Sequence, residues 1–456
     1  MSTTEVTGRA VARFVVFSAL GLFLFLAPIP TGDGTFNIPL GIAIGWFEST
    51  VLRHGEVDVA VLLLLAVTTV SALGAVVLAL ARPTFREGSV LAHAFRTGPV
   101  YVVSRVFAAV FAWMIFTGVG PEVIVSPDTG GVMQGVAAHL IAVFVFLGFA
   151  IPILTDFGVM EFAGALVART VRRLFTLPGR SSVDLMASWF GSSVASVILT
   201  RGQHEKGYYT GREAAVICTN FAFVSLPFSF VVAGFIGIED DFLPWYLIIC
   251  VVCVLLALVT PRIWPLRGLP DTFVDGSPAD ASRTQAEEAV PDGVPAARWG
   301  LRLATERASR TRLRDVAVTG LRTWVDIYAD LIPLILAWGT IAVAIFEFTP
   351  VFQWLSTPMG WYLGLFGIGD AMTYAPATLI GFADMFLPSL LLGDAERTTQ
   401  LVLGALSIVQ IVYMTETGVT ILKSRMPLNL GKLFAVFLIR TLVAIPVLAG
   451  LVWLVF

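Results

Sequence analysis

Long apolar runs separated by short polar stretches dominate the chain, and they predict helices that cross a membrane. A helix of about 20 apolar residues spans the hydrocarbon core of a bilayer. The runs expected to cross lie at 14–28, 59–81, 100–119, 135–154, 212–238, 244–259, 327–346, 398–422 and 433–456. The first run lacks an A-x-A cleavage site, so we expect a retained helix and not a removed signal peptide. The pattern predicts an all-α polytopic membrane protein with about nine transmembrane helices.

Two further apolar runs, 181–200 and 370–393, do not fit as complete crossings. Cytoplasmic loops are rich in lysine and arginine, and Arg9 and Arg13 therefore place the N-terminus inside. A full crossing at 181–200 would put the arginine-rich region 262–325 outside. We therefore predict re-entrant hairpins, the first entering from the cytoplasmic side and the second from outside. An ordinary crossing with unusual flanks is the alternative for the first.

The order of these elements occurs twice, once starting outside and once inside, which predicts inverted repeats of the kind found in secondary transporters. The predicted segments are N-terminal transmembrane helices at 1–134, a first repeat at 135–260, a cytoplasmic linker with a basic amphipathic helix at 261–325, and a second repeat at 326–456. The basic helix, at 299–315, is expected on anionic lipid head groups or as a solvated surface helix.

Composition excludes several classes of protein. Hydrophobic residues make up 57% of the 456 residues, and 29 Lys and Arg are balanced by 32 Asp and Glu, so no nucleic-acid partner is indicated. Cys250 and Cys253 form a C-x-x-C inside an apolar run without histidine nearby, which favours buried small side chains over a metal or redox site. The sequence contains no H-E-x-x-H, G-x-S-x-G or P-loop motif, so no enzyme and no cofactor is predicted.

The candidate chemistry centres on 407–424, SIVQIVYMTETGVTILKS, which we interpret as a membrane helix interrupted at 414–418. A carboxylate inside an apolar span is costly unless it is paired, hydrated or used, so Glu416 is a functional candidate. Its neutralisation by a proton or by an arginine on another helix is the alternative. The proline at Pro227 predicts a second break, because proline removes a helix hydrogen bond.

A polar solute needs donors and acceptors to replace its water. The hairpins and interrupted helices offer such groups, and the substrate-binding candidates are Ser188, Ser192, Ser193, Asn220, Ser225, Thr373, Tyr374, Thr378, Gln410, Thr415, Glu416 and Thr417. The candidates for ion coupling or charge recognition are Asp184, Asp384, Glu416 and Arg440.

Two of these charged candidates have alternative roles. Asp184 lies near the start of its hairpin, where a carboxylate also serves as a helix cap. Arg440 lies about 12 Å along its helix from Lys432. It is expected either to extend back toward the cytoplasm or to pair with Glu416 or Asp384.

Four blocks carry a family resemblance: GRSSVDLMASWFGSS, EKGYYTGREAAVI, LIGFADMFLP and IVYMTETGVTILKS. They resemble the YjiH-like family of nucleoside-recognition Gate-domain membrane proteins, and the similarity extends over most of the chain from about residue 155. The order of hairpin and broken helix also looks like that of concentrative nucleoside transporters, which are sodium- or proton-coupled homotrimers. Gate domains occur in bacterial ferrous-iron transporters too, but this chain lacks their long GTPase domain. The resemblance implies a membrane transport protein with two Gate repeats.

The sequence thus predicts a multi-pass protein of the cytoplasmic (inner) membrane with its N-terminus inside. The expected function is secondary transport of a small polar solute, nucleoside-like or amino-acid-like, coupled to sodium or protons. The alternative is a Gate-domain subunit that transports only with a partner protein. The expected partners are the solute, the lipid bilayer, and either further copies in a dimer or trimer or a second Gate-domain subunit.

Overall fold

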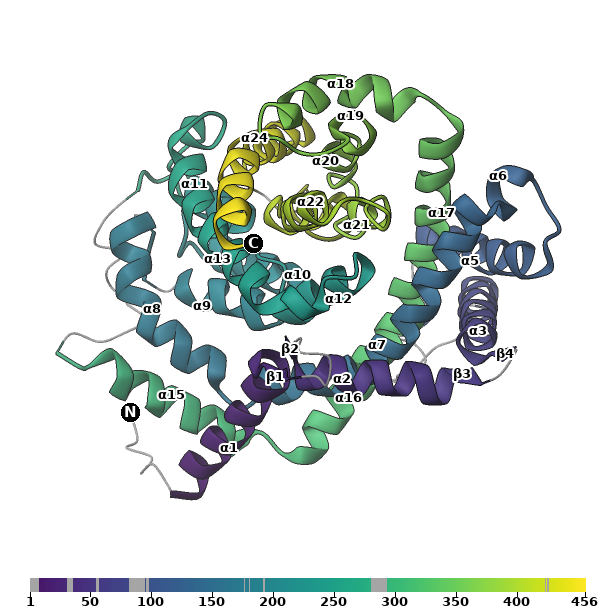
Figure 1. Ribbon diagram of the computed structural model, residues 1–456. Coiled ribbons are helices and arrows are strands. Elements are labelled where there is room, and N and C mark those ends of the chain that lie inside the picture. Colours follow the sequence, from purple (N-terminus) through teal and green to yellow (C-terminus); the bar gives the residue numbers. More distant parts are fainter. Residues whose placement is uncertain are drawn as a thin grey trace. The chain divides into compact units, whose positions relative to one another are not determined.

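The computed structural model describes residues 8–30, 36–54, 57–81, 95, 98–175, 177–179, 181–191, 193–279, 293–422, 424 and 426–456. These residues are almost entirely helical (Figure 1). The short strands are β1 (Ile29–Pro30), β2 (Phe36–Asn37), β3 (Arg53–His54) and β4 (Val57–Asp58), paired β1 with β2 and β3 with β4. The all-α class is confirmed. The middle of the predicted linker, 280–292, lies outside the described residues.

Seven helices in the described part are long and apolar enough to cross a membrane: Gly8–Leu26, Val59–Ala81, Pro99–Thr117, Glu122–Thr155, Glu239–Arg262, Leu313–Ile345 and Leu430–Val455. Each overlaps one of the predicted crossings, which confirms a polytopic membrane protein. The two remaining predicted crossings, 212–238 and 398–422, are interrupted in the structure, and each consists of two shorter helices. That these two segments cross the membrane stays a prediction.

The chain divides into two compact units, which interleave distant stretches of sequence. Unit 1 comprises Met1–Phe36, Ile153–Arg312 and Ser356–Phe456, and unit 2 comprises Asn37–Pro152 and Leu313–Leu355. The four segments proposed from the sequence follow chain order, and they remain a prediction.

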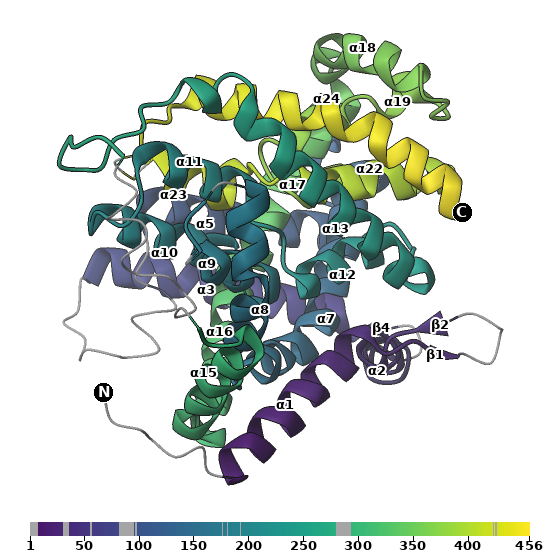
Figure 2. The same ribbon diagram turned by 90° about the vertical axis from the view of Figure 1, so that its left-hand side faces the viewer.

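Unit 1 contains both interrupted helices. Its helices are α1 (Gly8–Leu26), α8 (Val159–Phe175), α9 (Ser181–Met186), α10 (Ser193–Glu205), α11 (Gly211–Asn220), α12 (Leu226–Phe235), α13 (Phe242–Val259), α15 (Ala296–Arg310), most of α18 (Val351–Gly364), α19 (Ala371–Tyr374), α20 (Ala377–Ile380), α21 (Leu387–Leu390), α22 (Arg397–Val409), α23 (Val419–Leu422) and α24 (Leu430–Val455). Short 3-10 turns lie at Glu239–Asp241, Thr260–Arg262 and Leu266–Gly268. Helices α13, α22 and α24 pack against one another (Figures 1 and 2).

Unit 2 is built from long helices joined by tight turns. Its elements are α2 (Pro39–Phe47), a π-helical turn at Glu48–Leu52, α3 (Val59–Ala81), α5 (Pro99–Thr117), α6 (Glu122–Val125), a π-helical turn at Pro127–Gly131, most of α7 (Val132–Thr155), α16 (Leu313–Asp326), a π-helical turn at Ile327–Leu331 and α17 (Ile332–Phe348). Helix α5 packs between α3 and α17.

Helix α8 packs side by side with α15 (Figures 1 and 2). Small residues form the contact, since Ala165, Gly300 and Ala304 let the two backbones approach closely. Arg307 of α15 reaches Asp156 at 3.5 Å and Glu161 at 3.8 Å. The basic helix is therefore fixed to α8 by packing and by ion pairs.

The predicted basic helix 299–315 is too long. Helix α15 ends at Arg310, because Thr311 has an extended backbone and its Oγ1 donates to the Asp156 carbonyl at 2.8 Å. Leu313 then begins α16, which continues through the π-helical turn into α17. Arg312 thus lies in the link between the two helices, and Arg314 lies at the start of a helix long and apolar enough to cross a membrane.

Candidate functional site

The first hairpin is built from α9 and α10, joined by a π-helical turn at Ala187–Gly191. The two helices fold back on each other, since Ser196 Oγ donates to the Asp184 carbonyl at 2.8 Å. The Asp184 side chain is buried, and its Oδ2 accepts a 2.6 Å hydrogen bond from the Tyr209 hydroxyl. Asp184 therefore lies within the protein interior, and its role as a helix cap or in ion coupling stays a prediction.

The first interrupted helix consists of α11 and α12, with Phe221–Ser225 unwound between them. Pro227 occupies the first turn of α12, where its missing N–H is not needed, so the break precedes the proline. Ser188 Oγ of the hairpin donates to the carbonyl of Phe221, the first unwound residue. The hairpin therefore satisfies a backbone acceptor that the break creates.

The second interrupted helix repeats this arrangement with other residues. Helix α22 ends at Val409, and the chain is unwound from Gln410 to Tyr413 before a π-helical turn at Met414–Gly418. The break thus begins at Gln410, four residues before the predicted 414–418, and the φ of 63° at Ile411 is left-handed. Gln410 Nε2 donates to the Thr378 carbonyl of α20, which lies in the predicted second hairpin, at 2.8 Å.

Arg440 of α24 joins the two breaks. Its guanidinium is 0% exposed, and Nε and Nη2 donate to the Val409 carbonyl at 3.1 and 2.7 Å. Nη1 donates to Asn220 Oδ1 at 2.7 Å, and Thr260 Oγ1 donates to the same oxygen. The prediction that Arg440 extends toward the cytoplasm is wrong, because backbone and amide acceptors released by the breaks hold it inside.

The next residue of α24, Thr441, belongs to the same network. Its Oγ1 accepts a 2.8 Å hydrogen bond from Gln410 Nε2. Gln410 Oε1 is buried and has no hydrogen-bond partner among the described residues. The two amide side chains that end the first halves of the broken helices, Asn220 and Gln410, are thus both bound by neighbouring positions of α24.

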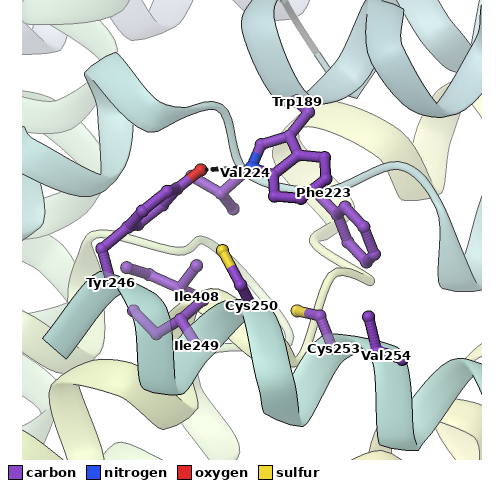
Figure 3. Close-up of a pocket in the computed structure, with 9 residues that line it drawn as sticks. All are labelled: Trp189, Phe223, Val224, Tyr246, Ile249, Cys250, Cys253, Val254 and Ile408. Carbon is purple, nitrogen blue, oxygen red and sulfur yellow. Dashed lines mark hydrogen bonds between the residues drawn. The ribbon is translucent and has the colours of Figure 1, made fainter. Parts of the chain in front are cut away.

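A small apolar pocket, drawn in Figure 3, lies among the elements that carry this network. Its lining residues come from the first hairpin, the first break, α13 and α22; they are Trp189, Phe223, Val224, Tyr246, Ile249, Cys250, Cys253, Val254 and Ile408. Trp189 Nε1 donates to the Tyr246 hydroxyl at 2.6 Å, which fixes both rings at the wall. Ile408 precedes Val409, so the pocket lies beside the carbonyl that binds Arg440.

The structure brings together part of the predicted site. Ser188, Asn220, Thr378, Gln410 and Arg440 are buried in one hydrogen-bonded network with the breaks. Ser193, Ser225 and Thr417 are buried too. Thr417 Oγ1 donates to the Ile411 carbonyl at 3.0 Å and so supports the break itself.

Other predicted residues lie apart or outside the description. Thr373 is exposed and Tyr374 half-buried on α19. Asp384 Oδ1 accepts a 2.8 Å hydrogen bond from the Phe386 amide in its own turn. Ser192 and the side chains of Thr415 and Glu416 lie outside the described residues. Their roles stay predictions.

Sequence reasoning missed two groups of residues. The aromatic pocket walls, Trp189 and Tyr246, were counted as ordinary apolar residues of their helices. In unit 2, Arg105 is 0% exposed within α5 and its Nη2 lies 2.5 Å from Asp330 Oδ1. Both charges lie inside apolar runs, so the rule that selects Glu416 would also have selected them. The described residues contain no cluster of His, Cys, Asp and Glu suited to a metal ion.

Comparison with known proteins agrees with this architecture. Residues 137–239 match the model of the Gate family, described as "Nucleoside recognition". An uncharacterized protein of Alkalihalophilus pseudofirmus is 39% identical over 441 residues, which cover 96% of this chain and 93% of that protein. No solved structure matches the chain significantly. The chain therefore belongs to a family of Gate-domain, nucleoside-recognition membrane proteins that includes this relative, and its architecture is transporter-like.

Proposed function

We propose that the protein is a secondary transporter that moves a small nucleoside-like solute across the cytoplasmic membrane. The observation that carries this proposal is the meeting of two interrupted helices, a hairpin and an apolar pocket within unit 1. In secondary transporters, substrates bind where interrupted helices meet, because unwound backbone supplies polar groups at membrane depth.

The pocket lining favours a solute with a planar apolar part. Trp189, Phe223 and Tyr246 present ring surfaces, and stacking on such surfaces tolerates any flat base. A small polar amino acid would leave its side chain without partners against this lining. The hydroxyls of a sugar would then reach the polar groups at the breaks, among them Ser225, whose Oγ has no hydrogen-bond partner within the described residues.

Sodium or protons are the proposed coupling ions, and Asp384 and Glu416 are the carboxylates proposed to couple them. The N-terminus is proposed to lie inside, on the positive-inside rule. A Gate-domain subunit that requires a partner protein remains the second candidate, because the family match at 137–239 concerns a domain and not a complete transport activity.

The first prediction tests binding in the pocket. A ligand of the folded state raises its apparent stability, so a nucleoside should raise the melting temperature of the purified protein by several degrees. Cys250→Phe should abolish the shift, because the Cys250 side chain points into the pocket (Figure 3). Val251→Phe is the matched control, because Val251 is the next residue of α13 and is 48% exposed.

Uptake into liposomes under imposed sodium or proton gradients then tests transport. Gradient-driven uptake by the purified protein would exclude the need for a partner. Binding that survives Cys250→Phe would contradict the pocket assignment, and binding without uptake would favour the partner-dependent subunit.

A further inference from the structure

Arg440 occupies an unusual electrostatic position for a buried arginine. All of its hydrogen bonds in the described part of the chain end on uncharged oxygens, namely the Val409 carbonyl and Asn220 Oδ1. A buried cation is costly unless negative potential compensates it. The groups around these two oxygens supply negative potential of this kind.

Both acceptors belong to the ends of helices. Val409 is the last residue of α22, and Asn220 is the last residue of α11. The C-terminus of a helix carries about half a negative charge, because its last carbonyls have no partner within the helix. Two such ends meet at the guanidinium of Arg440.

Unwound carbonyls and the C-terminal ends of half-helices are the groups that coordinate coupling cations in discontinuous transporter helices. In this chain, a side chain of α24 fills that position. Three guanidinium nitrogens donate to the two helix ends at 2.7 to 3.1 Å.

We propose that Arg440 is a built-in cation, which holds the two broken helices together in place of an added metal ion. This inference does not rest on the proposed function, since it concerns the folded state without solute. It requires the charge of residue 440, and not only its hydrogen bonds. The contact between the two broken helices should accordingly form without a sodium ion. Any sodium coupling would have to use another site, such as the carboxylates of Asp384 and Glu416.

The test compares charge with hydrogen bonding at residue 440 by melting temperature without solute. Arg440→Lys keeps the charge but places its three N–H donors on one nitrogen, whereas Arg440→Gln keeps two N–H donors and loses the charge. We expect the lysine variant to melt well above the glutamine variant. A glutamine variant that equals or exceeds the lysine variant would overturn the proposal, because hydrogen bonding alone would then suffice.

Chemical rescue gives an independent readout of the charge, because a sodium ion is a cation that donates no hydrogen bond. Arg440→Ala leaves space for a small cation, and Arg440→Met fills it with an apolar chain. Millimolar methylguanidinium or sodium chloride, compared with choline chloride at equal ionic strength, should raise the melting temperature of the alanine variant only. An alanine variant that responds to none of these cations would contradict the proposal. If that variant does not fold, the lysine and glutamine pair decides.

Discussion

Among the described residues, each unit contains one arginine that is fully buried, and the two charges are stabilised in different ways. Arg105 of unit 2 forms an ion pair with Asp330, which lies on the π-helical turn between α16 and α17. Its guanidinium also lies 5.9 Å from the centre of the Phe95 ring. Arg440 of unit 1 binds the ends of two broken helices instead.

The difference follows from the backbone around each arginine. Helices α5 and α17 are continuous where they pack, so their carbonyls are occupied and a carboxylate is needed near Arg105. The breaks lie at the ends of α11 and α22, so Arg440 is bound by the backbone carbonyl of Val409 and by the side-chain amide oxygen of Asn220, each at a helix C-terminus. A charged residue in a membrane helix therefore does not by itself indicate an interrupted helix. It does so when its partners are helix ends and not a carboxylate.

The largest expected effect comes from removing the carboxylate in unit 2. Asp330→Asn leaves Arg105 buried without its anionic partner, which should lower the free energy of unfolding by about 3 kcal/mol. The double variant Arg105→Met, Asp330→Leu should recover most of the loss, because an apolar pair replaces a buried ion pair at little cost.

A thiol-reactive dye can follow this unfolding, because Cys218 and Cys253 are buried and react only when exposed. Asp240→Asn serves as the control, since Asp240 is an exposed acid. If Asp330→Asn melted with the wild type, Arg105 would not depend on this carboxylate, and the contrast between the two units would fail.

A smaller effect is expected from substitutions of Asn220, whose side-chain oxygen is one of the acceptors of Arg440. Asn220→Ala removes the acceptor of Arg440 Nη1 and of Thr260 Oγ1, and should cost about 2 kcal/mol. Asn220→Asp places a carboxylate there and makes the site resemble unit 2. We expect its melting temperature to lie between those of the alanine variant and the wild type. An alanine variant as stable as the wild type would show that the end of α22 alone holds Arg440.

The smallest effect concerns the amide in the second break. A Cβ atom on Gly381 would overlap Gln410 Oε1 and push this amide away from Thr378 and Thr441. Gly381→Ala should therefore cost about 1–2 kcal/mol, as overpacking usually does. Gly393→Ala is the matched control, because a Cβ there meets no atom within 4 Å. Equal melting temperatures of the two variants would mean that Gln410 does not hold the second break.

The sequence predicted the helical class, the two interrupted helices and the side chains Asn220, Gln410 and Arg440. These features have signatures that depend on residue type, namely long apolar runs with polar residues inside them. It could not predict that Arg440 binds the Val409 carbonyl, because every residue has a carbonyl and only folding shows which one lacks a partner. The second break was placed too late, because Ile411 to Tyr413 contain neither glycine nor proline.

The left-handed backbone of Ile411 has a mechanical consequence. A β-branched residue disfavours this conformation, and the strain amounts to about 1–3 kcal/mol. Rewinding α22 through this position would release the strain, but the Val409 carbonyl would then accept from the Tyr413 N–H and be lost to Arg440. The torsional strain at Ile411 thus opposes the hydrogen bonds that Arg440 and Thr441 make with this break. A substitution at residue 440 that weakens these hydrogen bonds therefore favours a longer, straighter α22.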